Sequence, residues 1–330
     1  MSQRHISIQE REMIAQMHLG GSNQEAIATA IGKHQGTVSR ELSRNSGTGG
    51  YRPVTADDKA RQRRRAALRD RQVKMEQEEV VTAVKAGLRQ YWSPEQIVGR
   101  LEQQDRRIIS HQTIYAWIWR HKAQGGSWHK YLRQGHHKYR RHKRKSLDKR
   151  GKIPDRTFID QRPGEVGQRA RFGDWEGDTL IGGHHRGSVI SHVERKSQYT
   201  VLAPLPVLDH RLLVGASRRA FARHEGSLTL PRKTMTLDNG IEFWSHKGLG
   251  AALGLDVYFA LPHHPWERGV NEQVNGLIRQ FLPKGMNLTG VETRRLVRIE
   301  RLLNNRPRKT LGYQTPVEVL RQAPSYALRI

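Results

Sequence analysis

The sequence Trp175-Glu176-Gly177-Asp178-Thr179-Leu180-Ile181 is the first of several short strand-like segments in the second half of the chain, and its acidic residues stand out in a strongly basic protein. Two later segments carry a carboxylate in a similar setting: Thr236-Leu237-Asp238-Asn239-Gly240 and Arg268-Gly269-Val270-Asn271-Glu272. Carboxylates provide hard oxygen ligands, which suit a divalent cation beside polyanionic nucleic acid. Asp178, Asp238 and Glu272 are therefore candidate metal ligands of an enzyme that cuts or joins phosphodiester bonds.

The pattern of apolar residues around these segments predicts a mixed α/β layer fold with a five-stranded sheet. The expected strands cover Trp175–Ile181, Ser188–Glu194, Tyr199–Leu205, Lys233–Leu237 and Asp256–Leu261. Helices are expected around Leu212–His224, between the last two strands, and from about Val270. Ligands of such sheets bind near strand ends. The three carboxylates can therefore converge, because they lie in the first strand, at the end of the fourth strand and at the start of the last helix.

The helix that carries Glu272 also predicts supporting residues. At about 100° per residue, Arg268 and Arg279 fall within about 40° of Glu272, and Asn275 lies near them. Two guanidinium groups beside a metal-binding carboxylate suit an anionic backbone that lies across the site. A surface ion pair would give the same pattern, so both interpretations stay open here.

The composition indicates a nucleic-acid partner. The 330 residues include 58 Lys and Arg against 31 Asp and Glu, a formal net charge of +27, and residues 1–150 hold 31 of the basic residues against 14 acidic ones. This excess favours DNA or RNA binding, mainly through the N-terminal half. The length predicts two or three domains. No apolar stretch is long enough to span a membrane and no signal peptide opens the chain, so we expect a soluble intracellular protein without a membrane partner. The lack of cysteine excludes disulfides and thiolate zinc sites.

Residues 1–60 show a helix-turn-helix pattern. Apolar residues recur with helical spacing, Gly32 suits the tight turn, and Ser22 is expected to cap the first helix of the pair. The second helix is expected near Gln35–Arg44. Its exposed side chains are candidates for contacts with DNA bases: Gln35, Thr37, Ser39, Arg40 and Arg44. An ordinary helical hairpin is the alternative.

A second helical module is expected over residues 61–128, joined to the first by an Arg-rich helix at Lys59–Lys74. Ser93-Pro94-Glu95-Gln96 is typical of a helix start, and Ser110 begins another helix. The first residues of that helix are further candidates for DNA contacts: His111, Gln112 and Thr113. The connection between the two helices is long, so a purely structural helical domain is the alternative.

A basic linker is predicted over residues 129–155, ahead of a catalytic domain at 156–330 that ends in a helical extension. Lys130–Lys152 holds eleven basic residues and one acidic residue, with almost no apolar periodicity. Such a segment can bind DNA phosphates without reading their sequence. The residues expected to do so are Arg140, Arg141, Lys143, Arg144 and Lys145.

With these motifs the chain resembles DDE-type transposases of bacterial insertion sequences, specifically the IS-thirty family, which have an RNase H-like catalytic core. The resemblance covers nearly the whole chain and rests on Trp175–Asp178, Val193–Ser197, Leu237–Gly240, Trp266–Gly269, Asn271-Glu272, Asn275–Gln280, Leu303–Lys309, Thr37–Leu42 and Trp92–Ile97. Asp174 stands where the family often has a histidine. Asp174, Glu176 and Asp178 share one strand face, so periodicity alone does not choose among them. The resemblance points to Asp178.

The resemblance implies a transposase that binds the terminal inverted repeats of its element through the helix-turn-helix modules. Asp178, Asp238 and Glu272 would hold two Mg²⁺ ions, with Mn²⁺ as the alternative, for strand cleavage by water and for transfer of the freed 3′-hydroxyl to target DNA. Because two ends must meet, it implies a homo-oligomer, most simply a dimer, in the bacterial cytoplasm at the nucleoid. The alternatives are an RNase H-like nuclease, a phage-type integrase, and a helix-turn-helix regulator with an inactive catalytic domain.

Overall fold

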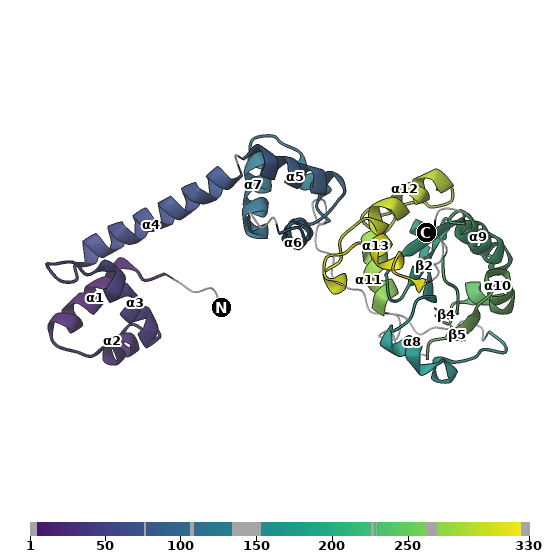
Figure 1. The fold of residues 1–330 in the computed structure, drawn as a ribbon, viewed down its shortest axis with the longest axis horizontal. Coiled ribbons are helices and arrows are strands. Elements are labelled where there is room, and N and C mark those ends of the chain that lie inside the picture. Colours follow the sequence, from purple (N-terminus) through teal and green to yellow (C-terminus); the bar gives the residue numbers. More distant parts are fainter. Residues whose placement is uncertain are drawn as a thin grey trace. The chain divides into compact units, whose positions relative to one another are not determined.

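The computed structural model describes residues 5–75, 77–105, 109–133, 153–225, 228, 230–261 and 269–324, except for the side chains of 67–74. The chain forms two compact units, Met1–Val80 and Val81–Ile330 (Figure 1). None of the described helices is long and apolar enough to cross a membrane. The predicted linker residues Arg140, Arg141, Lys143, Arg144 and Lys145 lie outside the described residues. The domain boundaries expected at residues 60, 128 and 155 stay predictions.

The first unit is built from four helices: α1 (Ile8–Leu19), α2 (Gln24–Ala30), α3 (Gln35–Asn45) and α4 (Pro53–Lys74). The apolar side chains that α1, α2 and α3 turn inward, with Tyr51 and Ala56, close one small core. α2 and α3 are the expected helix-turn-helix pair, and Gly32 between them has a φ of 63°, which glycine adopts without strain. The N-cap of α2 is Asn23, whose side chain accepts from the Ala26 N–H at 2.8 Å. The expectation of Ser22 was one residue early, because Asn23 is the residue next to the first helical turn.

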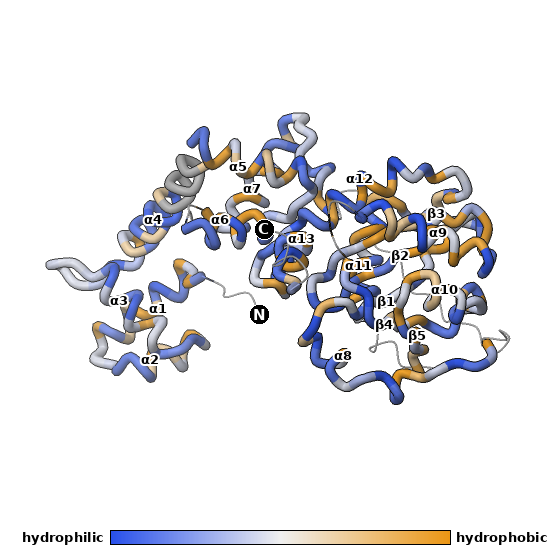
Figure 2. Tube along the Cα trace, turned by 45° about the vertical axis from the view of Figure 1, so that its right-hand side comes forward, coloured by the Kyte–Doolittle hydropathy of each residue, from blue (hydrophilic) through white to orange (hydrophobic). Residues whose placement is uncertain are grey.

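Buried charges join α4 to the rest of this unit. The guanidinium group of Arg11 on α1 donates to Glu41 on α3 at 2.7 Å and to Asp57 on α4 at 2.8 Å. All three residues are at most 9% exposed. Figure 2 shows that α4 itself is largely hydrophilic. Its attachment therefore depends on these ion pairs and on a few small side chains such as Ala56 and Ala60.

A helical part lies at the start of the second unit and is formed by α5 (Glu78–Arg89), whose first three residues precede the boundary at Val81, α6 (Pro94–Gln103) and α7 (His111–Ala123). The two expected helix starts are confirmed. Ser93 and Gln96 form a capping box on α6, and the Ser110 side chain accepts from the Thr113 N–H on α7. The hydroxyl and amide groups satisfy backbone N–H groups that have no partner inside a first helical turn.

A five-stranded sheet forms the centre of the second unit. Its strands are β1 (Asp174–Ile181), β2 (Ser188–Glu194), β3 (Thr200–Leu205), β4 (Thr234–Leu237) and β5 (Asp256–Phe259). They lie in the order β3-β2-β1-β4-β5, with β1, β2 and β3 antiparallel and with β4 and β5 parallel to β1. This is the mixed sheet and the RNase H-like fold expected from the sequence.

Helices cover both faces of the sheet. α9 (His210–Ala222) and α10 (His246–Leu253) cover one face and share a core with Trp175, Met235 and Leu237. α11 (Gly269–Ile278) and α12 (Thr293–Asn304) cover the other face and share a core with Leu180 and Leu202. The chain continues to α13 (Pro316–Leu320), which completes the expected helical extension.

Side chains of α12 form hydrogen bonds with the free backbone groups of the edge strand β3. Glu300 accepts from the Leu202 N–H at 2.6 Å, and Asn304 exchanges two hydrogen bonds of 2.8 Å with the backbone of Thr200. An exposed sheet edge presents unpaired backbone groups to other chains. Here the helix side chains take the place of a sixth strand.

The strand limits agree with the sequence within a few residues. The fifth strand ends at Phe259 rather than at Leu261, because Phe259 pairs with Leu237 and β4 ends there. α9 begins at His210, two residues earlier than expected, because the Asp209 carboxylate accepts from the Arg211 N–H and caps the helix.

A neutral histidine lies inside this fold. His192 of β2 is fully buried, and its Nε2 lies 3.0 Å from the Ser217 hydroxyl of α9. Burial lowers the pKa of His192 to about 3. In the unfolded chain a histidine has a pKa near 6.5, so the unfolded state binds more protons below that pH. The contribution of His192 to stability is therefore complete above pH 6.5 and falls as the pH is lowered toward 3.

We expect protonation linked to His192 to lower the free energy of unfolding of the wild type by about 2 kcal/mol between pH 7 and pH 5. Chemical unfolding of the wild type and of His192→Gln at both pH values would measure it. The variant should be less stable at pH 7 but should lose less on acidification. His111→Gln changes an exposed histidine and is the control. An equal pH dependence in all three proteins would contradict the assignment.

Candidate active site

Three acidic residues of β1 lie on the face of the sheet that α11 covers, and two of them are buried. Asp174 is 1% exposed and accepts from Arg171 Nε at 3.0 Å and from the Thr234 hydroxyl at 2.8 Å. Glu176 is completely buried. Asp178, nearer the end of the strand, is half-buried. The geometry thus separates three carboxylates that the strand periodicity could not distinguish.

Glu176 fixes the position of α11. Its Oε1 accepts from Arg195 Nη1 at 2.5 Å, and its Oε2 accepts from the backbone N–H of Asn271 in the first turn of α11 at 2.9 Å. Arg195 is only 6% exposed, and its own N–H donates to the Asp174 carbonyl at 2.8 Å. A carboxylate at a helix N-terminus satisfies a free N–H group and favours the helix dipole. The sequence did not reveal this role, because Arg195 follows Glu176 by 19 residues and lies beyond the end of another strand.

Asp178 has polar neighbours from α11. Asn275 Nδ2 donates to Asp178 Oδ2 at 2.6 Å, and the Ser191 hydroxyl donates to Asn275 Oδ1 at 2.8 Å, which orients the amide. Arg279 is close enough to interact with the Asp178 charge. Burial lowers the pKa of the Arg279 guanidinium, and Asp178 partly opposes that shift. The structure therefore brings together Asp178, Asn275 and Arg279.

Asp238 follows directly after β4, the parallel neighbour of the strand that carries Asp178. β1 and β4 are parallel and pair Glu176 with Thr236. Asp178 lies two residues further along β1, and Asp238 lies two residues after Thr236, just past the end of β4. Continued by two residues, the register would bring them side by side on the same face of the sheet. The Asp238 carboxylate accepts from the Gly240 N–H at 3.1 Å. A Cβ at Gly240 would come within 2.5 Å of the Glu242 carboxylate, so a larger residue there would displace that side chain.

Glu272 lies in the first turn of α11, one residue after Asn271, and is exposed. In the part of the chain that the structure describes, no three Asp, Glu or His side chains are close enough together to hold one metal ion. Glu272 is thus not gathered with the two aspartates. Arg268, expected beside it, falls in residues 262–268, which lie outside the described residues.

The donor set nevertheless fits a hard divalent cation. Two aspartates from adjacent strands and an exposed glutamate supply oxygen ligands only, which favours Mg²⁺ or Mn²⁺ over softer metals. Asp178 and Asp238 have fixed backbones, whereas the Glu272 side chain is solvent-exposed and can change rotamer. The arrangement therefore supports a site that the third carboxylate completes.

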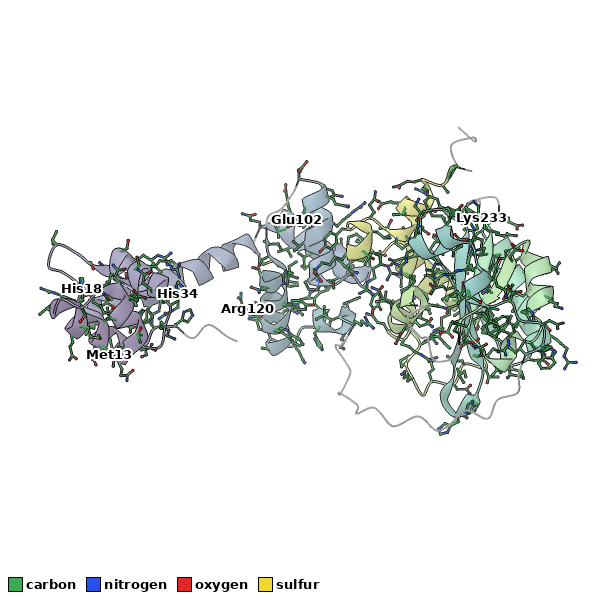
Figure 3. All side chains as sticks on the ribbon, turned by 90° about the horizontal axis from the view of Figure 1, so that it is seen from below. Met13, His18, His34, Glu102, Arg120 and Lys233 are labelled. Atoms are coloured by element: carbon green, nitrogen blue, oxygen red, sulfur yellow. The ribbon has the colours of Figure 1, made fainter. Side chains whose placement is uncertain are left out.

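A basic groove lies in the first unit between α3 and α4. Three of the residues expected to contact DNA line it, together with a lysine of the turn before α3 and two arginines of α4: Thr37, Arg40, Arg44, Lys33, Arg63 and Arg64. His34, which Figure 3 labels, precedes α3, and its Nδ1 accepts from the Gly36 N–H at 3.1 Å. Gln35 is exposed and bonds to Gln24, and Ser39 is half-buried outside the lining of the groove.

The residues expected to contact DNA in the second module lie at the start of α7. His111 and Gln112 are exposed, and Thr113 is half-buried, with its hydroxyl 3.0 Å from that of Ser110. Positive groups that the sequence analysis had not assigned to a site lie elsewhere in the second unit. These are Arg133, Arg306, Arg308 and Lys309, which line one cavity. The closely spaced Arg306-Pro307-Arg308-Lys309 was a signal for them.

Known proteins match the N-terminal region of the chain and also nearly its whole length. A family model described as a helix-turn-helix domain matches residues 2–45. The chain is 38% identical to the transposase for insertion sequence element IS4351 of Bacteroides fragilis, over 97% of this chain and 96% of the relative. It is 37% identical to the transposase for IS1086 of Cupriavidus metallidurans, over 90% and 88%. It is 35% identical to the transposase InsI for IS30A of Escherichia coli K12, over 96% and 83%.

The buried pair of Glu176 and Arg195 leads to a stability prediction. Arg195→Met would leave the Glu176 carboxylate buried without its charged partner, so we expect a loss of about 3–5 kcal/mol in the free energy of unfolding. Urea unfolding of the full chain would measure it. Glu165→Gln is the control, because the Glu165 side chain that pairs with Arg171 is 65% exposed, and its loss should cost less than about 1 kcal/mol. Equal, small losses in both variants would show that Glu176 does not depend on Arg195.

Proposed function

The chain belongs to the family of insertion-sequence transposases that includes InsI of IS30A, and from this premise we propose that it cuts DNA at the ends of its own mobile element and joins those ends to target DNA. The single observation that best supports a carboxylate site for this reaction is the register of β1 and β4, which pairs Glu176 with Thr236 and, continued by two residues, would bring Asp178 beside Asp238. Glu272 enters from α11, whose first turn is held against the same strand by Glu176.

The reaction has two steps at phosphorus. In the first, a water oxygen attacks the phosphorus at the end of the element, a new P–O bond forms, the P–O3′ bond breaks, and the strand keeps a free 3′-hydroxyl. In the second, this 3′-hydroxyl attacks a phosphorus of the target strand while the target's own P–O3′ bond breaks. Two Mg²⁺ ions held by Asp178, Asp238 and Glu272 would supply an activated attacking oxygen and a stabilised leaving oxygen.

Neighbouring residues would prepare the carboxylates for this role. The Asn275 amide holds one oxygen of Asp178, and the Gly240 N–H holds one oxygen of Asp238. Arg279 adds a positive charge close to Asp178. A guanidinium group there would attract the phosphate backbone of the strand that is to be cut.

The helical modules would bind the element's terminal inverted repeats. The groove between α3 and α4 collects positive charge beside a helix of the kind that enters the DNA major groove. Two ends must be held together for joining, so we infer a homo-oligomer, most simply a dimer. Acting on the DNA of its host, the protein would work in the cytoplasm at the nucleoid.

Removing one carboxylate should abolish cleavage without loss of DNA binding. We expect Asp178→Asn, Asp238→Asn and Glu272→Gln each to reduce nicking of a labelled element end in Mg²⁺ by about 1000-fold or more, because metal ligands contribute several kcal/mol to the transition state. Gel-shift affinity for the same DNA should change by less than about twofold, since the binding modules are separate.

Asp256→Asn is the matched control. Asp256 is an exposed carboxylate at the start of β5, where it pairs with Thr234 at the end of β4 remote from Asp238. This variant should nick normally. A triad variant that keeps Mg²⁺-dependent nicking would remove that residue from the site.

Arg40 should contribute to recognition of sequence. Arg40→Ala is expected to weaken binding to the element end by about 1–3 kcal/mol, with little change on random DNA, if its guanidinium contacts a base. Competition gel shifts on both DNAs would measure the difference. The control is Arg61→Ala, because Arg61 is exposed, pairs with Asp57 and does not line the groove. Equal losses of Arg40→Ala on both DNAs would make Arg40 a phosphate contact, and no loss would exclude it from the interface.

A further inference from the structure

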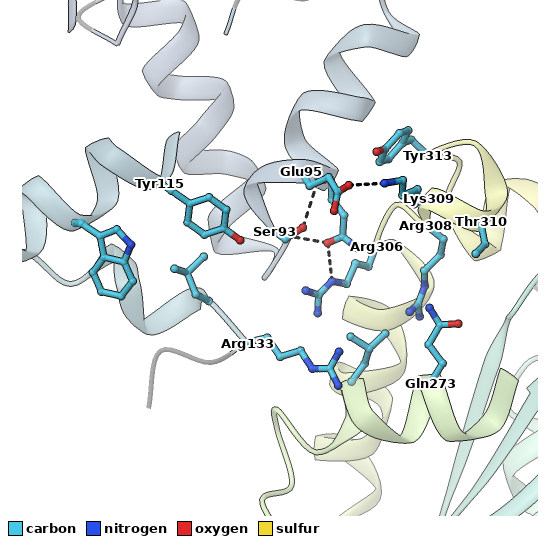
Figure 4. Close-up of a pocket in the computed structure, with 14 residues that line it drawn as sticks. Ser93, Glu95, Tyr115, Arg133, Gln273, Arg306, Arg308, Lys309, Thr310 and Tyr313 are labelled. Atoms are coloured by element: carbon cyan, nitrogen blue, oxygen red, sulfur yellow. Dashed lines mark hydrogen bonds and ion pairs between the residues drawn. The ribbon is translucent and has the colours of Figure 1, made fainter. Parts of the chain in front are cut away.

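A cavity in the second unit gathers positive charge away from the carboxylates. It is lined by α6, α7, α11 and the segment after α12, and its charged or polar residues include Arg133, Arg306, Arg308, Lys309 and Gln273. Figure 4 shows the guanidinium groups of Arg133, Arg306 and Arg308 pointing into the same space above Gln273. Three guanidinium groups that converge on one space are the pattern of an anion site.

Two of these arginines are buried. Arg306 and Arg308 are each 3% exposed. Arg306 donates to the amide oxygens of Gln96 at 2.9 Å and Gln280 at 3.0 Å, and Arg308 makes one long bond of 3.4 Å to the Leu303 carbonyl. The buried Nε of Arg308 has no hydrogen-bond partner among the described residues. Buried polar groups are normally satisfied, so this N–H indicates a missing acceptor.

Neither buried arginine has a carboxylate partner among the residues that the structure describes. The one acidic residue that lines the cavity is Glu95, and it pairs with Lys309 at 2.8 Å at the exposed rim. Burial is the main cause that lowers the pKa of Arg306 to about 10 and of Arg308 to about 9, and the neighbouring guanidinium groups lower both further. Elsewhere in the chain, buried arginines face carboxylates, as Arg11 and Arg195 do. Among the described residues no carboxylate offsets the charge of the two buried arginines, and an anion bound in the cavity would do so.

The cavity and the proposed site of cleavage both use residues of α11. Gln273 and Leu277 line it and lie on α11, and Gln273 follows Glu272 directly. Consecutive helix residues differ by about 100° in direction and 1.5 Å in height. Arg133 also lines a second cavity, with Lys130, Arg295 and Arg298. Positive side chains thus continue from the first cavity into the next.

We propose that Arg306 and Arg308, with Arg133 and Lys309 at the mouth, bind a backbone phosphate of the DNA strand that is held at the carboxylate site. The proposal rests on the proposed function for the identity of the strand, but the cavity and its unmatched charge do not depend on it. Phosphate oxygens would accept from the free Nε of Arg308 and neutralise the buried charge.

The first test measures anion binding by the full-length protein without DNA or metal. Inorganic phosphate, exchanged for chloride at constant ionic strength, should raise the melting temperature by about 5 °C at 100-fold above its Kd, because it binds only the folded state. We expect Arg308→Gln to lose most of this rise and Arg308→Lys to keep part of it. An equal rise in the wild type and in Arg308→Gln would overturn the proposal.

Replacing a buried arginine can unfold the protein, so the same site is also tested with a variant of an exposed residue at the rim of the cavity. Lys309→Gln changes a side chain that is 73% exposed, and its matched control is Lys247→Gln, which changes a side chain that is 70% exposed and paired with Asp155. The phosphate-induced rise should shrink in Lys309→Gln and remain in Lys247→Gln. Equal behaviour of the two variants would count against a site at this cavity.

The second test asks whether the anion belongs to DNA. Binding of an element end is measured over a series of salt concentrations without Mg²⁺, so that no cleavage occurs. Arg133→Gln combined with Lys309→Gln should flatten the slope of log affinity against log salt by about 0.9 for the phosphate lost, and Lys247→Gln should leave it unchanged. A variant that loses the response to free phosphate but keeps the full DNA slope would overturn the assignment to DNA. Because this readout needs no catalysis, an inactive wild type would contradict the proposed function alone.

Discussion

The position of α11 against the sheet depends on the buried contact of Glu176 with Arg195 and with the N–H of Asn271. One carboxylate thereby joins β1, the end of β2 and the first turn of the helix. The hydrophobic contacts of Val270 and Val274 stabilise the packing of α11 on the sheet, but they do not fix its orientation, because apolar contacts are not directional. Hydrogen bonds are specific for angle, and this set decides which helix residues come to Asp178.

The proposed site is therefore made of parts with different freedom. Asp178 lies in the central strand β1 and Asp238 directly after its neighbour β4, and Asn275 lies on a helix that Glu176 holds one turn earlier. Glu272 shares that helix but keeps an exposed side chain. The buried arginines also differ in their partners. Arg11 and Arg195 are buried with carboxylates, whereas Arg306 and Arg308 are buried with neutral partners only among the described residues.

Much of this architecture was predictable from local patterns. Ser188–Glu194 was expected as a strand and is one, because apolar and β-branched residues cluster there between turn residues. The contacts between distant segments were not predictable. Glu300 reads as an ordinary polar position of an amphipathic helix until the fold places it against the N–H of Leu202. Likewise the local sequence predicts a surface position for Arg306. Its contact with Gln96 of α6, which lies 210 residues earlier in the chain, exists only in the folded protein.

The ion pairs of Arg11 bear on where the first unit can be divided. The helix-turn-helix family model ends at residue 45, yet Arg11 donates to Asp57 on α4, and Arg63 donates to the buried Asn45 side chain. A fragment that ends at residue 45 would keep the Arg11 guanidinium group and its partners Glu41 and Ile6 but would lose Asp57, one of its two carboxylate partners. The smallest autonomous form of this unit therefore includes the first three turns of α4, and shorter fragments that unfold would say nothing about DNA recognition by α3.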